Sequence, residues 1–157
     1  MRIKIVPYKP CFKKYFEYLN RNWLEEIFEV EPADEMVFQN PEYYILQPGG
    51  QIFFILQDDT PVGTCAIIPV GTHKFELSKM AVDPACCRLG YGTRLMEAAI
   101  EFAREANAGK IFLITDTKLT AAIRLYQRYG FTIVPHTPDP RYQRGNVRME
   151  LALVSQK

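Results

Sequence analysis

Apolar and polar positions alternate along the chain with two different periods, one typical of helices and one typical of strands. Segment 11–30 carries apolar side chains at helical spacing: Phe12, Tyr15, Phe16, Leu19, Trp23, Ile27 and Phe28. The polar run Asn20-Arg21-Asn22 offers a point where this segment would divide into two helices. The pattern predicts an edge strand before it, at 3–7, and a short helix or loop after it, up to Pro41.

The following segments have the character of strands. Apolar residues fill 52–56 and 62–68, and the turn sequence Asp58-Asp59-Thr60-Pro61 between them predicts a hairpin. A strand at 75–82 completes an antiparallel meander. The expected order is then helix, strand, helix, strand and a last strand at 147–153, after a polar loop at 135–146. This order predicts an α+β fold of three layers, with helices on both faces of a mixed, mostly antiparallel sheet.

The helix after the meander has the most regular pattern. Its apolar face is formed by Leu95, Ala99, Phe102, Ala103 and Ala106, and charged residues occupy the opposite face. We expect the helix to end near Asn107-Ala108-Gly109, with Gly109 as its C-terminal glycine. Such a helix packs on a sheet and leaves its N-terminus free.

Length and composition indicate a single domain over residues 1–157. The chain is 48% apolar, which allows a full hydrophobic core without disulfides or metals. A net charge of +1 disfavours sequence-independent binding to nucleic acid. No apolar run approaches the ~20 residues of a membrane span, and the first residues lack a signal-peptide pattern. We therefore expect a cytoplasmic protein without nucleic-acid or membrane partners.

The cysteines and histidines do not indicate a disulfide scaffold or a metal site. The chain has four cysteines at unrelated spacings: Cys11, Cys65, Cys86 and Cys87. The adjacent pair Cys86 and Cys87, with only His73 and His136 elsewhere, does not make a zinc site. We predict reduced thiols and no metal.

A glycine turn connects the third strand of the meander to the regular helix. In Leu89-Gly90-Tyr91-Gly92-Thr93, two glycines let the backbone approach a bulky anion and direct several N–H groups at it. The helix N-terminus adds further free N–H groups and the positive end of its dipole. The pattern therefore predicts a phosphate or pyrophosphate site. A P-loop is disfavoured because no lysine follows Gly92, and a dinucleotide site because Leu95 replaces the third glycine.

Further motifs stand in register with this turn. They are Val82-Asp83-Pro84, Gly90-Tyr91-Gly92, Leu125-Tyr126 and Gly130-Phe131. In this order they resemble the GCN5-related N-acetyltransferases, the GNAT superfamily. The resemblance implies a GNAT-like fold and an acetyl-CoA-dependent N-acetyltransferase. Such an enzyme moves the acetyl group directly to a primary amine of a small molecule or peptide.

The resemblance also implies which residues bind acetyl-CoA. The strand backbone would pair with the pantetheine arm as an added strand does, and the glycine turn would hold the phosphates. The implied residues are Met80, Ala81, Val82, Cys87, Arg88, Leu89, Gly90, Tyr91, Gly92, Thr93 and Asp116. Two of them depart from the family pattern. Cys87 replaces an Arg or Gln, with Arg88 as the nearest charge, and Asp116 stands where an asparagine is frequent.

Two side chains are the predicted catalytic groups. Tyr126 is the general acid that the resemblance implies for the departing thiolate, and the alternative is a core tyrosine. Glu76 is the predicted general base, and the alternative is a solvated carboxylate on an exposed strand face. Asp116 and Glu35 are weaker candidates, and neither histidine lies in a recognisable catalytic pattern.

By the same resemblance, the N-terminal helices cover the site of the acceptor. They carry a run of acidic residues: Glu25, Glu26, Glu29, Glu31, Asp34 and Glu35. One hypothesis is an acidic rim that attracts a cationic amine, and the other is a solvated helix face. Two alternative functions stay open: a non-catalytic acyl-CoA-binding sensor or regulator, and an enzyme for a longer acyl group. The last pair of strands is a candidate edge for a homodimer.

Overall fold

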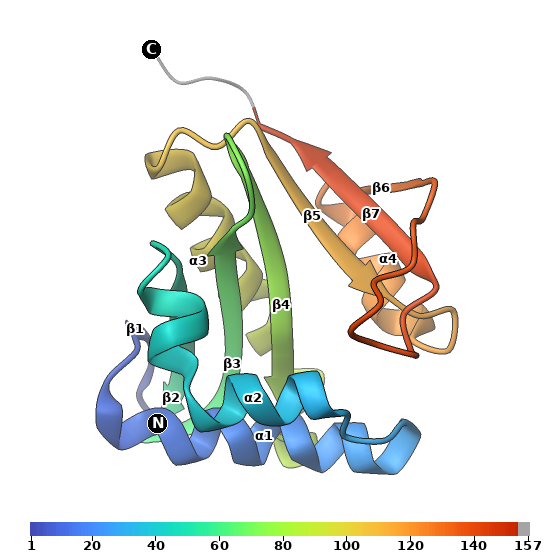
Figure 1. Cartoon of the computed structure of the whole chain (residues 1–157). Helices are drawn as coiled ribbons and strands as arrows, with labels where there is room; N and C mark the ends of the chain where they lie inside the picture. The colour runs from blue at the N-terminus through green and yellow to red at the C-terminus, as the bar shows by residue number, and fades with distance from the viewer. Residues whose placement is uncertain (154–157) are drawn as a thin grey trace.

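The strands form one mixed sheet in the order β1-β2-β3-β4-β5-β7-β6 (Figure 1). The computed structural model describes residues 1–153, and within them the strands are β1 (Ile3–Pro7), β2 (Gln51–Gln57), β3 (Thr60–Pro69), β4 (Lys74–Val82), β5 (Lys110–Thr115), β6 (Thr132–Val134) and β7 (Val147–Ala152). Neighbouring strands are antiparallel except β4 and β5, which are parallel. The predicted α+β fold with a mostly antiparallel sheet is confirmed.

Helices cover both faces of this sheet. They are α1 (Lys13–Ile27), α2 (Pro32–Gln39), α3 (Tyr91–Glu105) and α4 (Thr120–Arg128), with short helical turns η1 (Pro10–Phe12), η2 (Glu42–Leu46) and η3 (Pro84–Cys86). Alternation along β2 explains the two hydrophobic cores, because Phe54 packs with α1 and α2 while Ile55 packs with α3. None of the described helices is both long and apolar enough to cross a membrane.

Two local predictions about helices are wrong. Helix α1 runs without a break through Asn20-Arg21-Asn22. It does so because Nδ2 of Asn20 donates to the carbonyl of Phe16 (2.9 Å) and Arg21 pairs with Glu17 (2.7 Å), so both side chains have a partner on the preceding turn of the helix. At the end of α3 it is Asn107, not Gly109, that adopts the left-handed conformation (φ +59°).

The feature that positions the site is the divergence of β4 and β5. Their parallel pairing covers only Lys74 with Lys110, Phe75 with Ile111, and Glu76 with Phe112. Beyond these pairs β4 continues to Val82 next to β3, whereas β5 follows β7 (Figure 1). The edge of β4 that faces β5 is therefore open over its second half.

A bulge lies in that open half of β4. Opposite Cys65 of β3, strand β4 places two residues, Lys79 and Met80, between the pairs Ser78–Ala66 and Ala81–Thr64. Lys79 adopts a left-handed backbone conformation (φ +53°), which is uncommon for a residue with a long side chain. Bulges re-aim side chains and backbone groups next to functional sites.

Candidate functional site

A cavity of about 290 Å³ lies between the diverging strands. Residues 76–82 of β4 and 113–115 of β5 form its sides. Helix α1 contributes Asn20, Trp23 and Leu24, while Leu119, Ala122 and Tyr126 close the opposite side. The predicted residues Glu76, Met80, Ala81, Val82 and Tyr126 all line this one cavity.

The glycine turn presents a row of free backbone N–H groups. Within the described residues, the N–H groups of residues 88–93 donate to no backbone or side-chain acceptor, and the first paired one is that of Arg94, which donates to the carbonyl of Gly90 (3.2 Å). Gly90 is the N-cap of α3 with φ +79°, a conformation that glycine adopts without strain. These N–H groups and the N-terminus of α3 have the geometry that suits an anion.

Gly92 connects this N–H row to the cavity. A Cβ atom at Gly92 would lie 3.7 Å from the side chain of Leu125 and 4.0 Å from the sulfur of Met80. The turn thus opens between β4 and α4, the two elements that flank the cavity. The side chain of Tyr91 is buried in the core under α3, so only its backbone faces the anion site.

The two departures from the family pattern occupy different environments. Cys87 and Arg88 are both exposed beside the N–H row, and Arg88 has a left-handed backbone (φ +67°). Asp116 is buried and shapes the turn after β5, because its Oδ1 accepts the N–H of Lys118 (3.0 Å) and its carbonyl accepts that of Leu119 (2.9 Å). The Asp116 carboxylate therefore has a role in the turn, whatever it contributes to cofactor binding.

Glu76 lies in the cavity wall with its carboxylate unengaged. It is part-buried, and none of the hydrogen bonds or ion pairs within residues 1–153 uses its side chain. Burial raises the pKa of Glu76 above its usual 4.5, and the nearby cations Arg141 and Lys79 oppose the shift. A carboxylate with a raised pKa is a better proton acceptor, so the location and the pKa both suit a general base.

Tyr126 lies across the cavity from α1. Its ring packs against Phe131 at a centroid distance of 5.9 Å, and burial, with a smaller contribution from Cys65, raises the pKa of Tyr126 to about 12. The phenol therefore keeps its proton at neutral pH. The residue is both a packing residue and a wall of the cavity, so the two interpretations of the sequence are compatible.

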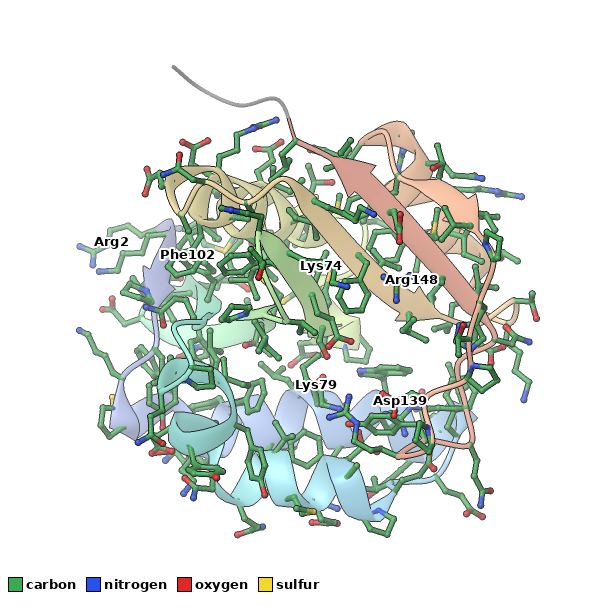
Figure 2. All side chains as sticks on the ribbon, turned by 45° about the horizontal axis from the view of Figure 1, so that its top comes forward. Arg2, Lys74, Lys79, Phe102, Asp139 and Arg148 are labelled. Carbon is green, nitrogen blue, oxygen red and sulfur yellow. The ribbon has the colours of Figure 1, made fainter. Side chains whose placement is uncertain are left out.

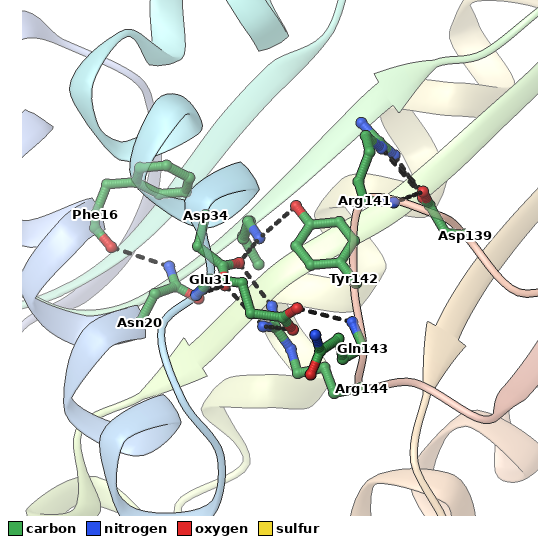
Figure 3. A network of polar contacts seen from close by, with 10 residues as sticks. Phe16, Asn20, Glu31, Asp34, Asp139, Arg141, Tyr142, Gln143 and Arg144 are labelled. Atoms are coloured by element: carbon green, nitrogen blue, oxygen red, sulfur yellow. Dashed lines mark hydrogen bonds and ion pairs between the residues drawn. The ribbon is translucent and has the colours of Figure 1, made fainter.

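A buried charge network closes the side of the cavity next to α2. Asp34 is fully buried, and its carboxylate binds Lys79 Nζ (2.6 Å) and both terminal nitrogens of Arg144 (2.6 and 2.7 Å) (Figure 3). Glu31 adds a bond to Arg144 (3.0 Å) and accepts the N–H of Gln143 (2.7 Å). The network ties α2 to β4 and to the loop between β6 and β7.

The network also determines the charge state of Asp34. Burial alone would raise the pKa of Asp34, but Arg144 and Lys79 outweigh it and lower the pKa to about 2. In Figure 2, Lys79 is labelled where the sheet meets the N-terminal helices, and Asp139 on the loop between β6 and β7. Because the carboxylate of Asp34 binds both Lys79 and Arg144, neither cation is without a counter-ion.

No local pattern in the sequence indicates several of these residues. Lys79 and Arg144 lie 45 and 110 positions from Asp34, and no local pattern connects them. Asn20 was expected at a break between two helices and Trp23 in the core, whereas both residues line the cavity. The acidic-rim hypothesis is weakened, because Glu31 and Asp34 pair with Arg144 and Glu35 pairs with Arg21 (2.7 Å). Within this network, the capping box of Glu31 and Asp34 at the start of α2 is the one feature that a local sequence pattern could predict.

Metal ligands do not gather at this site or elsewhere in the described part of the chain. No group of at least three His, Cys, Asp or Glu side chains is arranged to hold a metal ion there. The cavity itself is lined by the carboxyl of Glu76 and the phenol of Tyr126, together with polar side chains such as Lys79 and Arg144.

Comparisons with known proteins identify relatives of this chain. The model of the acetyltransferase (GNAT) family matches residues 15–131. N-acetyltransferase family 8 member 2 of Rattus norvegicus is 24% identical over 134 residues, which cover 80% of this chain and 55% of that protein. The chain thus spans about half the length of this curated relative.

Solved structures share the fold over the whole chain. An acetyltransferase of the GNAT family from Staphylococcus aureus Mu50 superposes with a TM-score of 0.89 at 24% identity, covering 98% of this chain and 100% of that one. A putative acetyltransferase from Salmonella typhimurium, solved with its cofactor acetyl-CoA, gives a TM-score of 0.76 at 17% identity over 100% and 97% of the two chains. At these identities the likeness establishes the fold.

Proposed function

The chain belongs to the acetyltransferase (GNAT) family, and from this premise we propose that it transfers the acetyl group of acetyl-CoA directly to a primary amine of a small molecule or peptide. One observation carries the proposal. A carboxyl and a phenol, both with raised pKa values, line a single cavity that adjoins a row of free backbone N–H groups.

The residues present fit acetyl-CoA. The N–H groups of residues 88–93 and the N-terminus of α3 suit its phosphates, and exposed Arg88 supplies a positive charge nearby. The open edge of β4 at Met80, Ala81 and Val82 suits the amide-containing pantetheine arm, which pairs as an added strand would. Gly92 leaves the passage between the two free of side-chain bulk.

Acetyl-CoA supplies an acyl group that is activated as a thioester, and the protein supplies proton transfer and charge stabilisation. The neutral amine attacks the carbonyl carbon with its lone pair, and Glu76 accepts the proton that the nitrogen loses as the carbon–nitrogen bond forms. A backbone N–H at the β4 bulge donates to the carbonyl oxygen as negative charge develops on it. Tyr126 donates its proton to the sulfur as the carbon–sulfur bond breaks.

Turnover with a panel of amines tests this proposal. Purified protein, acetyl-CoA and one amine at a time are combined, and the released thiol of CoA is measured. Amine-dependent release that Glu76→Gln lowers at least tenfold supports the transferase. Tight acetyl-CoA binding without release for any amine would instead favour the sensor or regulator, which the departures at Cys87 and Asp116 already recommend as the second candidate.

We also propose a cytoplasmic location and self-association through the β6 edge. The four cysteines are all free thiols, as suits a reducing compartment. Strand β6 is a sheet edge on which Ile133 is 57% exposed. Light scattering of the wild type and of Ile133→Lys tests the association, which the lysine should abolish.

A further inference from the structure

The bulge in β4 decides which side chains of this strand face α3. Before the bulge, Phe75 and Leu77 belong to the hydrophobic core beneath α3, and after it Met80 and Val82 pack against the same core. Because side chains alternate along a strand, a strand without the extra residue would place Lys79 in this core and turn Met80 to the opposite face. The bulge therefore exchanges the faces of Lys79 and Met80.

Lys79 is held on the opposite face by a cage that consists of Asp34, Phe38, Tyr142 and Arg144. Its Nζ lies 2.6 Å from the fully buried carboxylate of Asp34 and 3.3 Å from the hydroxyl of Tyr142. The same nitrogen lies over the rings of Phe38 and Tyr142, 5.7 and 5.0 Å from their centroids. Arg144 binds the same carboxylate, so the loop between β6 and β7 is part of the cage (Figure 3).

The backbone of Lys79 is strained, and the cage compensates for that strain. A left-handed conformation (φ +53°) is unfavourable for a residue that has a Cβ atom. Without the bulge, however, the Lys79 ammonium would leave all of its partners and enter an apolar core, which is more costly. The side chain of Lys79 is only 9% exposed, so the cage rather than water satisfies its charge. The bulge thus depends on contacts from residues that are far away in the sequence.

The bulge lies where the proposed reaction needs a backbone donor. Pairing of β4 with β5 ends at Glu76, and the residues of β4 beyond it line the cavity. A backbone N–H of the bulge is the proposed donor to the thioester carbonyl oxygen, and such a donor acts only when it is aimed at that oxygen. Loss of the bulge would turn this part of the strand and move Met80 away from Gly92, which its sulfur now approaches.

We propose that Lys79 and Asp34 are positioning residues for acetyl transfer, because their ion pair holds the β4 bulge in the conformation that aims its N–H at the thioester carbonyl. The inference rests on the proposed function and adds two residues that take part in no proton transfer. A purely electrostatic role of Lys79 is the alternative, since burial raises the pKa of Glu76 and both Arg141 and Lys79 oppose that rise. Only the positioning role depends on the backbone conformation of residue 79.

A matched pair of variants separates the two roles. Lys79→Ala and Lys79→Gly both remove the ammonium, but only alanine is strained in the left-handed conformation. The bulge should therefore be lost in Lys79→Ala and largely kept in Lys79→Gly. Asp34→Asn removes the counter-ion and leaves Lys79 in place, so it should resemble Lys79→Ala. Lys74→Ala removes a lysine from the start of β4, outside the bulge, and is the control.

Methyl NMR measures the bulge without any ligand. In protein with 13C-labelled methionine methyl groups, the methyl of Met80 should give a nuclear Overhauser cross-peak to the α-protons of Gly92. The cross-peak should be present in the wild type, in Lys74→Ala and in Lys79→Gly. In Lys79→Ala and Asp34→Asn it should weaken at least about threefold, because a strand without the bulge turns Met80 to the other face. Full intensity in Lys79→Ala overturns the proposal.

Infrared difference spectroscopy measures how strongly the bound thioester is polarised, with acetyl-CoA labelled with 13C at the carbonyl. The wild type and Lys74→Ala should lower the carbonyl frequency relative to free acetyl-CoA, and an unshifted carbonyl in the wild type overturns the proposal. Lys79→Ala should lose most of this shift and about tenfold or more of kcat, while KM for acetyl-CoA changes less than about threefold. Lys79→Gly should keep most of both. Equal losses in the two variants would leave Lys79 only the electrostatic role and overturn the positioning one.

The two proposals fail in distinguishable ways. If the wild type acetylates amines and Lys79→Ala keeps the cross-peak, the carbonyl shift and kcat, the transferase stands and the inference is rejected. If the wild type acetylates no amine, the transferase is rejected and the positioning role with it. The cross-peaks of Lys79→Ala and Lys79→Gly still decide, in that case, whether the cage holds the bulge.

Discussion

The N–H row and the cavity beside it are built in different ways. The donor end, next to α3, consists of backbone N–H groups from one continuous stretch, residues 88–93, which lies outside the cavity lining. The end next to α1 and α2 consists of side chains from four segments, joined by the network around Asp34 and Arg144. The first end depends on glycine conformation and on a helix terminus. The second depends on pairs of residues that meet only in the folded chain.

This contrast separates the part of the site that would bind the donor from the part that would bind the acceptor. We expect a backbone site to bind the phosphates and amides of the donor and to tolerate changes such as Cys87, because no side chain forms it. A side-chain site recognises one acceptor and changes with every substitution. Changes at the N–H row and at the side-chain site should therefore have different effects, and five variants or conditions test this, in descending order of effect.

Filling the passage at Gly92 should have the largest effect. In Gly92→Trp the indole would occupy the space between Met80 and Leu125, so affinity for acetyl-CoA should fall more than about a hundredfold while the fold is retained. Calorimetry and circular dichroism measure the two properties. Ala106→Trp places the same bulk at the exposed far end of α3 and should bind normally. Normal acetyl-CoA binding by Gly92→Trp would contradict the location of the donor site.

Breaking the buried network should destabilise the protein without removing the donor site. Asp34→Asn leaves Lys79 and Arg144 without their shared buried counter-ion, so we expect the free energy of unfolding to fall by about 3–5 kcal/mol. Glu35→Gln breaks a more exposed pair and should cost less than about 1 kcal/mol. Urea denaturation measures both. A loss for Asp34→Asn no larger than that for Glu35→Gln would contradict the network's role.

The same carboxylate makes a prediction about acid stability. The pKa of Asp34 is lowered to about 2, so its contribution is complete above its ordinary value of 3.8 and is lost as pH falls towards 2. The wild type should therefore lose more stability than Asp34→Asn over this interval. Parallel acid-denaturation curves for the two proteins would contradict the linkage.

Removing the phenol of Tyr126 should affect chemistry and leave donor binding intact. In Tyr126→Phe we expect kcat to fall about a hundredfold, since proton transfer to a leaving group contributes this order of rate, and acetyl-CoA affinity to change less than about threefold. Tyr129→Phe is the matched control on the same helix, because its hydroxyl bonds to Glu97 outside the cavity. Full turnover by Tyr126→Phe at saturating substrate would remove the acid assignment.

The pH dependence of the reaction should report the titration of Glu76, and this is the smallest of the five expected effects. Because the pKa of Glu76 is raised above 4.5, kcat/KM should increase with pH through a midpoint above that value as the carboxyl loses its proton. Glu76→Gln should lack this limb, and steady-state kinetics across the acidic range measure it. A limb that survives unchanged in the variant would belong to another group.

The fold and the donor end were largely predictable from the sequence, for a physical reason. Alternation in β2, the apolar face of α3 and the turn at Gly90 are local patterns, and each element is specified by its own residues. Two local signals were misleading. Asn20 suggested a break in α1, but its Nδ2 donates to the carbonyl of Phe16 within the helix, which continues. At the end of α3, Asn107 adopts the left-handed conformation that was expected at Gly109.

The acceptor end was not predictable, because its partners are distant in sequence. Glu31 and Asp34 appeared to be part of an uncompensated acidic run, and Arg144 appeared to be a loop residue. Only the fold brings the guanidinium of Arg144 to 3.0 Å from the carboxylate of Glu31 and 2.6 Å from that of Asp34. Likewise, the sequence placed Asn20 at a break between two helices and Trp23 in the core. The divergence of β4 and β5 opens the cavity that both residues line.

The central claim is that the backbone N–H row and the open edge of β4 bind acetyl-CoA. Calorimetric titration of the wild-type protein with acetyl-CoA, and with ATP and NAD as controls, tests it most directly. We predict selective acetyl-CoA binding with a Kd in the micromolar range or tighter, because ATP and NAD offer phosphates but no pantetheine arm for the edge of β4. Absent binding, or equal affinity for all three ligands, would contradict the account.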